Sequence, residues 1–134
     1  MEEVVWTEAF SVGVPLLDQQ HQKLVELINR LLAFDDADAS ESYHNVLYDL
    51  LSFAKLHFQT EETLMRMHRY PGLAAQVEEH AGYLDKLKDF GADVRDGVID
   101  VRGLNVYLRA WWIEHIVESD MAYRPFFVQI KMHV

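Results

Sequence analysis

The feature that most constrains this chain is a helical period of apolar residues, which recurs in four successive segments separated by short helix-breaking stretches. The segments run from about Asp18 to Phe34, from a cap near Ser40 to about Arg69, from about Leu73 to Phe90, and from near Asp100 to about Glu118. Within each segment, apolar side chains return every three or four residues and therefore share one helix face. Because short connections between long helices favour antiparallel neighbours, the sequence predicts an all-α fold, an up-down-up-down antiparallel four-helix bundle.

The breaks between the segments consist of residue types that end helices. "DDADAS" at 35–40 favours turns and caps, "YPG" at 70–72 forms a tight corner, and "GADVRDG" at 91–97 is expected to end the third helix. In the third segment the inner face is predicted to consist of Leu73, Val77, His80, Leu84 and Leu87. The breaks therefore delimit the four helices and set which of them are neighbours.

The two ends of the chain are expected to lie outside the helical bundle. Residues 1–15 are predicted to form an extended N-terminal arm laid over it. Pro125 is expected to interrupt the last helical turns, leaving residues 124–134 as an apolar tail or the start of a linker. At 134 residues the chain is long enough to bury a core, so we predict one domain, residues 1–134.

Composition excludes several kinds of partner and chemistry. The chain has 22 acidic and 12 basic residues, a formal net charge of −10, so nucleic acid and anionic membrane surfaces are poor partner predictions. Cysteine is absent, which rules out disulfides, thiolate metal ligands and cysteine nucleophiles. The start "MEEVVWTEAF" has acids where a signal peptide needs basic residues, and no segment reaches the roughly 18 apolar residues of a membrane span. We therefore expect a cytoplasmic protein without a membrane partner.

Each predicted helix carries one histidine in its apolar stripe: His21, His57, His80 and His115. Any one of them alone is more often a core histidine satisfied by a nearby carbonyl. When the helices are folded back on one another about the three breaks, however, these histidines and Glu61, one turn after His57, reach one level to within several ångström. Four imidazoles and a carboxylate are therefore expected to converge in one layer of the interior.

Two explanations of such a cluster are open. A hydrogen-bonded histidine–carboxylate network is one, although half-satisfied networks destabilise a core. A metal site is the better account, because neutral imidazoles and carboxylates suit iron, manganese or zinc, whereas the lack of sulfur argues against copper(I) and iron–sulfur clusters. Asp120 follows His115 by five residues, which is off the same-face spacing of an α-helix. Its carboxylate can still reach the site from the flank.

Four motifs resemble those of the bacterial hemerythrins: "LLDQQHQKLVELIN", "HFQTEETLM", "YPGLAAQVEEH" and "HIVESD". The resemblance covers the chain from Trp6 to about Tyr123, and an HxxxE followed by an HxxxxD in this order is specific. It implies a non-haem di-iron centre inside the bundle, in which carboxylates and an oxo or hydroxo group bridge two iron ions. It also implies reversible O2 binding at one iron, with NO or peroxide as alternative ligands.

By position in the motifs, the resemblance assigns His21 and His57 to the iron that binds O2, His80 and His115 to the other iron, and Glu61 and Asp120 as bridges. It also implies a further histidine four residues before His80, where this chain has Gln76. Two octahedral irons offer about twelve positions, and the glutamine leaves about two of them open or weakly filled unless its amide oxygen coordinates. We expect an iron that is more accessible to water and small ligands, with quicker autoxidation and a shifted redox potential. Gln76 as a weak ligand or vacant-site neighbour is preferred over a site that holds one metal, and over a metal-free bundle.

Bulky apolar residues flank the predicted ligands: Phe58, Trp111, Trp112 and Ile116. Core packing is the default explanation for such residues at helical spacing. The resemblance adds that residues beside the ligands of the second and fourth helices line the O2 pocket, where apolar walls slow proton entry and oxidation. Trp112 is large for that role, so access to the pocket is expected to be restricted.

The function implied is O2 binding rather than catalysis, so the domain itself is not expected to be an enzyme. The preferred hypothesis is an O2- or redox-sensing input domain of a bacterial signalling protein, with a cyclic-di-GMP or chemotaxis output in a fused or associated domain. The altered ligand set suits such a sensor better than a durable store. A free-standing oxygen carrier or storage protein is the alternative, and a di-iron oxidase or peroxidase follows it. A metal-free helical interaction module is the last hypothesis, and iron analysis decides it.

Overall fold

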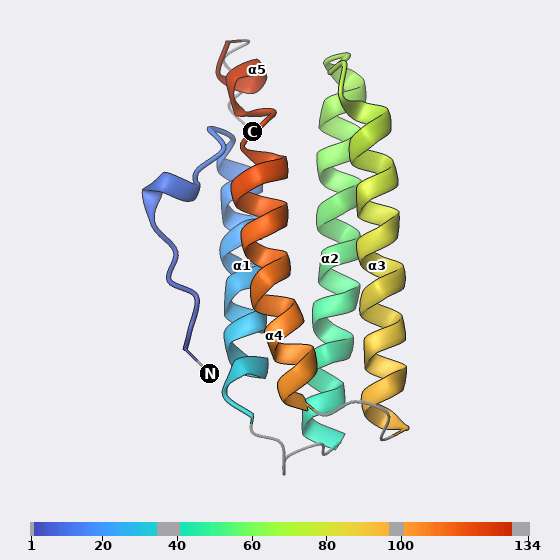
Figure 1. Cartoon of the computed structure of the whole chain (residues 1–134). Coiled ribbons are helices and arrows are strands. Elements are labelled where there is room, and N and C mark those ends of the chain that lie inside the picture. Colours follow the sequence, from blue (N-terminus) through green and yellow to red (C-terminus); the bar gives the residue numbers. More distant parts are fainter. Residues whose placement is uncertain (1, 35–40, 97–100, 130–134) are drawn as a thin grey trace.

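The computed structural model describes residues 2–34, 41–96 and 101–129, and in these ranges it is a bundle of long helices (Figure 1). The elements of the arm and the bundle are η1 (Glu8–Phe10), α1 (Pro15–Leu32), α2 (Glu41–Met67), α3 (Leu73–Arg95), α4 (Val101–Trp112) and η3 (Ile113–Asp120), a π-helical segment that continues α4. α1 packs against α2 and α4, and α3 packs against the same two helices, which closes the ring of four. The predicted up-down-up-down antiparallel bundle is therefore confirmed.

The first and third helices are longer than predicted. α1 begins at Pro15, three residues earlier than expected, because proline lacks only an amide hydrogen that the first helical turn leaves unused. α3 continues past Phe90 to Arg95, so it ends inside "GADVRDG" but five residues later than the predicted boundary. Gly91 lies inside this helix, where an added Cβ would be 3.1 Å from Leu47 Cδ2 on α2. The glycine therefore permits close packing of α3 on α2 instead of stopping the helix.

Main-chain hydrogen bonds form the corner between α2 and α3, together with the predicted Pro-Gly pair. Arg69 adopts the left-handed region, with a φ of 55°. The Tyr70 amide donates to Met65 O at 2.8 Å, and the Arg69 amide donates to Arg66 O at 3.2 Å. These two bonds make a Schellman motif, which satisfies the last carbonyls of α2. The chain can therefore reverse at once into α3.

The segment after η3 is helical, contrary to expectation. Pro125 lies in the first turn of α5 (Arg124–Gln129), where a missing amide hydrogen costs no bond, so the prediction that it interrupts the helix is wrong. Phe127 of α5 is fully buried in a second apolar cluster. Residues 130–134 of the predicted tail, and the predicted helix cap near Ser40, lie outside the described residues.

The N-terminal arm lies beside α1 (Figure 1), and polar side chains of α1 fasten it there. Asn29 exchanges two hydrogen bonds of 2.8 Å with the backbone of Val4. Asp18 accepts one bond from the Val12 amide at 2.8 Å and one from the Ser11 hydroxyl at 2.6 Å. The arm is extended apart from the single turn η1, in agreement with the predicted arm.

The inner face of α3 differs from the prediction by one position. Val77 is 37% exposed, whereas Gln76 is 6% exposed. Gln76 is four residues before His80 and shares its face, while Val77 lies at the edge of that face. The prediction that Val77 belongs to the inner face is therefore wrong, and a polar amide is buried in its place.

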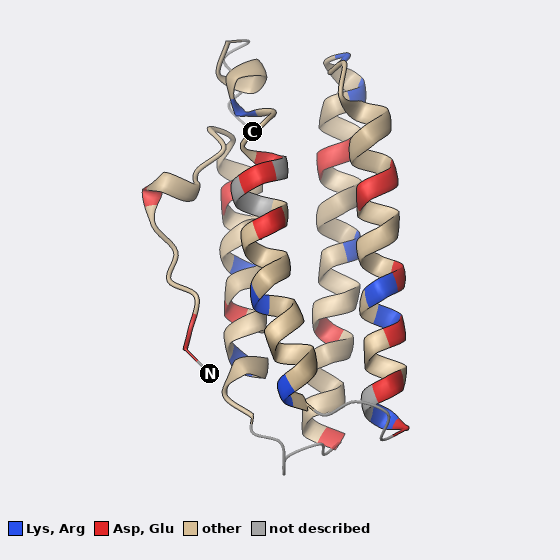
Figure 2. Cartoon of the chain, in the orientation of Figure 1, with Lys and Arg blue, Asp and Glu red and all other residues tan. Residues whose placement is uncertain are grey.

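Charged residues occur along all four helices (Figure 2). Among the described residues, Glu61 and Asp120 are the only buried acids. The other described acidic side chains keep contact with solvent. No helix in the described part of the chain combines the length and the apolar character needed to cross a membrane. The two buried acids therefore stand out as needing a partner inside the bundle.

Candidate metal centre

All six predicted ligands lie together in the interior of the bundle. His21 comes from α1, His57 and Glu61 from α2, His80 from α3, and His115 and Asp120 from η3. Each of these residues is at most 1% exposed. The helical periods that bury the apolar stripes therefore bring four imidazoles and two carboxylates into one water-excluded layer.

The ligand atoms form two overlapping groups. One consists of His21, His57, Glu61 and Asp120, and the other of Glu61, His80, His115 and Asp120. Within each group the candidate ligand atoms lie within 4.8 Å of one another. Both carboxylates belong to both groups, so they lie between two positions that each have two imidazoles. This arrangement fits a pair of metal ions bridged by carboxylates.

A π-helical segment aligns Asp120 with His115. In η3 the hydrogen bonds connect residue i with residue i+5, so residues five apart lie on one face. His115 Nε2 is accordingly 3.1 Å from Asp120 Oδ2. The same oxygen lies 2.9 Å from His21 Nε2 on α1. The wider coil explains how a five-residue spacing, which does not suit an α-helix, places both side chains at the site.

The nitrogen and oxygen atoms at the centre are close together without forming hydrogen bonds. Glu61 Oε1 is 2.6 Å from His57 Nε2, 3.6 Å from His80 Nε2 and 3.7 Å from His115 Nε2. The four Nε2 atoms, Glu61 Oε1 and both oxygens of Asp120 are buried and have no hydrogen-bond partner among the described residues. Ligands about 2.1 Å from an octahedral ion are about 3 Å apart when adjacent. The donor set and its spacing therefore fit metal ions, and a core that left these atoms without partners would be destabilised.

A hydrogen bond on its outer nitrogen orients His57. Its Nδ1 lies 2.8 Å from Gln20 Oε1. The Gln20 amide nitrogen donates to Thr60 Oγ1 at 3.2 Å, and the Thr60 hydroxyl donates to Leu56 O at 2.9 Å. Because Thr60 donates its hydroxyl proton to Leu56 O, it can only accept a hydrogen bond from Gln20. The amide nitrogen of Gln20 therefore faces Thr60, and its oxygen faces His57. His57 Nδ1 therefore carries the proton, and Nε2 presents a lone pair to the centre.

His80 has a carboxylate in the same outer position. Its Nδ1 lies 2.7 Å from Glu62 Oε2. Its ring stacks on Phe58, with centroids 4.1 Å apart and planes 8° apart. An ionised carboxylate can only accept, so Nδ1 carries the proton and Nε2 faces the centre.

Aromatic packing holds the other two histidines. His115 stacks on Trp111 with centroids 5.4 Å apart and planes 3° apart, and His21 meets Trp112 edge-on at 6.2 Å. The Nδ1 atoms of His21 and His115 have no hydrogen-bond partner among the described residues. The four histidines therefore fall into two classes, two with a polar outer partner and two oriented by aromatic rings.

The Tyr123 hydroxyl contacts the shared carboxylate of Glu61. It donates a hydrogen bond of 2.7 Å to Glu61 Oε2, and both side chains are fully buried. Burial raises the pKa of Tyr123 well above its ordinary value, and the charges of Asp120 and Glu61 raise it further. The phenol therefore keeps its proton and remains a donor, while Oε1 of Glu61 faces the histidines.

Ionisation in the cluster follows from burial and from mutual charge. Burial favours the protonated form of Glu61, but the imidazoles of His57 and His115 outweigh it and hold the pKa of Glu61 well below its ordinary value. Burial lowers the pKa of His57 in spite of the neighbouring carboxylate. Burial also opposes protonation of His115, but Asp120 and Glu61 outweigh it and raise the pKa of His115 to about 10. Glu61 is thus ionised and suited to a cation, and a metal that binds at His115 displaces a proton.

Gln76 occupies the position at which the sequence motifs imply a further histidine. It lies four residues before His80 on α3 and is 6% exposed. A buried amide on α3 therefore stands at the position where the motifs imply an imidazole, one turn before His80.

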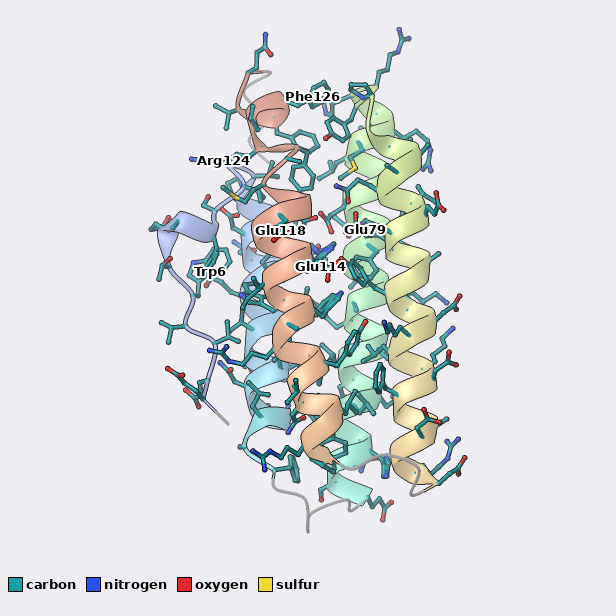
Figure 3. All side chains as sticks on the ribbon, viewed as in Figure 1. Trp6, Glu79, Glu114, Glu118, Arg124 and Phe126 are labelled. Carbon is teal, nitrogen blue, oxygen red and sulfur yellow. The ribbon has the colours of Figure 1, made fainter. Side chains whose placement is uncertain are left out.

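The apolar residues predicted to line an O2 pocket divide between two sides of the centre. Phe58 and Trp111 border a small cavity between α2, α3 and α4, together with Tyr83, Tyr107 and Leu108. Trp112 lies on the α1 side, with ring centroids 6.3 Å from Trp6 and 5.9 Å from Phe10 of the arm. Figure 3 shows Trp6 between the arm and the bundle. The Ile116 side chain lies outside the described residues.

Comparison with known proteins identifies the family. The family model described as "Hemerythrin HHE cation binding domain" matches residues 12–127. The chain belongs to the hemerythrin family. A bacteriohemerythrin of Stenotrophomonas maltophilia (strain R551-3) is 26% identical over 134 residues, which are 100% of this chain and 86% of that protein. A hemerythrin-like protein of Naegleria gruberi is 32% identical over 122 residues, which are 89% of each chain. A crystal structure of wild-type hemerythrin matches with a TM-score of 0.79 at 28% identity, over 91% of this chain and 95% of that chain.

Membership of the hemerythrin family fixes the cofactor. Hemerythrins bind O2 at a di-iron centre, and the buried histidines, glutamate and aspartate of this chain form two groups able to hold metal. The predicted family and the predicted cofactor, two iron ions, are therefore confirmed.

Sequence reasoning did not single out Gln20, Glu62 or Tyr123. Gln20 immediately precedes His21 and Glu62 immediately follows Glu61. A residue next to a ligand on a helix points about 100° away from it, toward a neighbouring helix. The positions of Gln20 and Glu62 could therefore have predicted that each contacts a ligand of another helix. Tyr123 carried none, because it follows the end of η3 and no helical period connects it with Glu61.

Proposed function

We propose that this hemerythrin-family domain binds its two irons through six side chains and uses them to bind O2. The ligands are His21 and His57 at one iron, His80 and His115 at the other, and Glu61 and Asp120 between them. The iron pair, when bound, supplies the redox chemistry through which O2 binds reversibly. The observation that carries the assignment is the convergence of four imidazole Nε2 atoms, without hydrogen-bond partners among the described residues, on two shared carboxylates.

The residues around the ligands orient them for metal binding and keep water out. Gln20 and Glu62 fix the proton of a histidine on the outer nitrogen, so that the inner nitrogen is a lone-pair donor. Tyr123 holds the outer oxygen of Glu61. Trp111 and Trp112 are buried on two sides and exclude water. The ligands are therefore held in place by contacts that do not depend on the metal.

We infer that the domain senses O2 or redox state rather than storing O2. An amide is a weaker donor to iron than imidazole, so the iron beside Gln76 has a coordination position open to small ligands such as O2, and it oxidises readily through that position. His115 and Asp120 both lie on η3, so a change at the metals acts directly on this segment and on α5 beyond it. Packed helices respond to small displacements in discrete steps. Such a step would pass the signal to a fused or associated output domain, of the cyclic-di-GMP or chemotaxis kind.

Iron content and the optical spectrum of the oxidised protein test the proposal. We expect about two irons per chain, with a near-ultraviolet charge-transfer band from a bridged ferric pair. One iron per chain would make Gln76 a lost ligand at a single-metal site. No iron after growth in iron-supplemented medium would refute the sensor and the carrier together.

A free-standing oxygen carrier is the second candidate, and the length of the relatives favours it. The chain spans 86% of the Stenotrophomonas bacteriohemerythrin and 89% of the Naegleria hemerythrin-like protein, so neither relative has room for a large additional domain. Repeated cycles of oxygenation and deoxygenation distinguish the two functions. A carrier remains ferrous through many cycles, whereas the sensor proposed here accumulates the ferric form within a few.

A further inference from the structure

The two histidines with polar outer partners have chemically different ones. His57 Nδ1 faces the neutral amide oxygen of Gln20 at 2.8 Å, and His80 Nδ1 faces the carboxylate of Glu62 at 2.7 Å. Because the distances are nearly equal, both imidazoles are oriented equally well. The two outer hydrogen bonds therefore differ in the charge of the acceptor rather than in length.

Glu62 is placed to act as a charged partner. It follows Glu61 on α2, but its side chain reaches His80 on α3, and 20% of the side chain remains exposed. The stacking of His80 on Phe58 fixes the plane of the ring. His80 is thus held between a charged acceptor at Nδ1 and the metal centre at Nε2.

The charged partner lies in the half of the centre in which Gln76 occupies a position where the sequence motifs imply an imidazole. A carboxylate on the outer nitrogen makes an imidazole a stronger metal donor. His80 belongs to the group with His115, on the helix where Gln76 lies one turn earlier. His57, with its neutral partner, belongs to the other group. The imidazole with the charged partner, His80, therefore lies on the same helix as Gln76, the amide found where the motifs imply an imidazole.

We propose that Glu62 is a positioning residue whose negative charge strengthens His80 as an iron ligand and offsets the weak ligand at Gln76. The iron on this side stays bound as a result and is the more readily oxidised of the two. Gln20 has the complementary role, since its neutral amide leaves His57 a weaker donor and favours the ferrous form on the O2-binding side. The inference rests on the proposed di-iron function.

The substitution Glu62→Gln separates charge from orientation, because a glutamine oxygen can still accept the Nδ1 proton. We expect E62Q to bind the second iron about 10–100-fold more weakly, measured by chelator competition, and to have a higher reduction potential, measured by redox titration. E62A loses the bond as well as the charge and should bind this iron more weakly still. Q20E should shift the potential in the opposite direction. E78Q removes a charge from an exposed position of α3 and should change neither quantity.

The outcomes separate this inference from the proposed function. A parent protein that loads no iron refutes both. A parent that loads two irons and binds O2, with E62Q equal to it in affinity and potential, overturns this inference alone, because Glu62 would then only orient the ring. Circular dichroism shows whether each variant keeps its helices. If E62Q does not fold, Q20E decides, and an unchanged potential in Q20E overturns the inference.

Discussion

Tyr123 and Glu61 are 62 residues apart in the chain and are joined by a hydrogen bond of 2.7 Å between two fully buried side chains. The donor follows η3 and the acceptor lies in α2. Tyr123 also packs with Phe127 of α5 in the second apolar cluster. The bond therefore connects the C-terminal segment with a carboxylate that both halves of the metal centre share.

Replacing Tyr123 with phenylalanine is expected to remove this bond while keeping the ring. Glu61 Oε2 then loses its donor, and a hydrogen bond to a charged group is worth about 1.5–3 kcal/mol. We expect Y123F to lower the free energy of unfolding of the iron-free protein by about 2 kcal/mol, measured by urea denaturation. Tyr70 is partly buried in the same cluster, so Y70F is a matched control and should change stability by about 0.5 kcal/mol or less. Equal losses in the two variants would contradict the importance of the bond to Glu61.

Replacing Gln76 with histidine is expected to supply an imidazole on the face of His80. Because imidazole is the stronger iron donor, the variant should hold its second iron about tenfold more tightly, or about 1.4 kcal/mol. It should also autoxidise more slowly than the parent, because the imidazole fills the coordination position that is open beside Gln76. Chelator competition and the rate of appearance of the ferric spectrum measure these two effects.

The matched control for this position is Val77→His. Val77 is the next residue along α3 but is 37% exposed, so its imidazole should change neither iron retention nor the autoxidation rate. If Q76H autoxidises as fast as the parent, or if V77H has the same effect as Q76H, the role assigned to Gln76 is wrong.

The helices and the meeting of the histidines could be predicted because both follow from a period that is visible in the sequence. His57 and Glu61 are four residues apart, which places them on one face of any α-helix. The Pro-Gly corner then sets α3 beside α2. These inferences need only local residue types and the rise per residue of a helix.

The remaining features depend on contacts that the sequence does not display. The alignment of Asp120 with His115 requires a π-helical segment, and the residues of η3 do not distinguish it from an α-helix. Gly91 could end a helix or permit close packing, and the choice depends on Leu47 of another helix. The bond from Tyr123 to Glu61 likewise depends on where the chain turns after η3.

The Schellman motif at the end of α2 supports a prediction that is independent of the metal. Arg69 is exposed and has a φ of 55°, a conformation that glycine adopts without strain. R69G should therefore raise the free energy of unfolding by about 0.5 kcal/mol, the relief of strain being partly offset by the greater freedom of glycine in the unfolded chain. R69A keeps the Cβ and should show no gain. A destabilised R69G would contradict the strain at this position.

Tyr43 supports a prediction about alkaline pH. It is fully buried on α2 and donates a hydrogen bond of 3.3 Å to Asn105 Oδ1 on α4. Burial raises the pKa of Tyr43 above the ordinary tyrosine value of 10.0. The folded chain therefore keeps the phenol proton at a pH at which the unfolded chain releases it. Stability is fully present below the ordinary pKa and is lost as the pH rises above it.

The free energy of unfolding that Tyr43 contributes falls by about 1.4 kcal/mol per pH unit in this range. Removing the titrating group in Y43F should reduce the slope of unfolding free energy against pH, above about pH 10, by this amount. Y43F is expected to be less stable than the parent at neutral pH, since it loses the bond to Asn105, and the difference should shrink as the pH rises. Y48F, at a position 69% exposed, should leave the slope unchanged. Urea denaturation at a series of alkaline pH values measures both slopes, and parallel curves for Y43F and the parent would show that Tyr43 ionises in the folded chain as it does in the unfolded one.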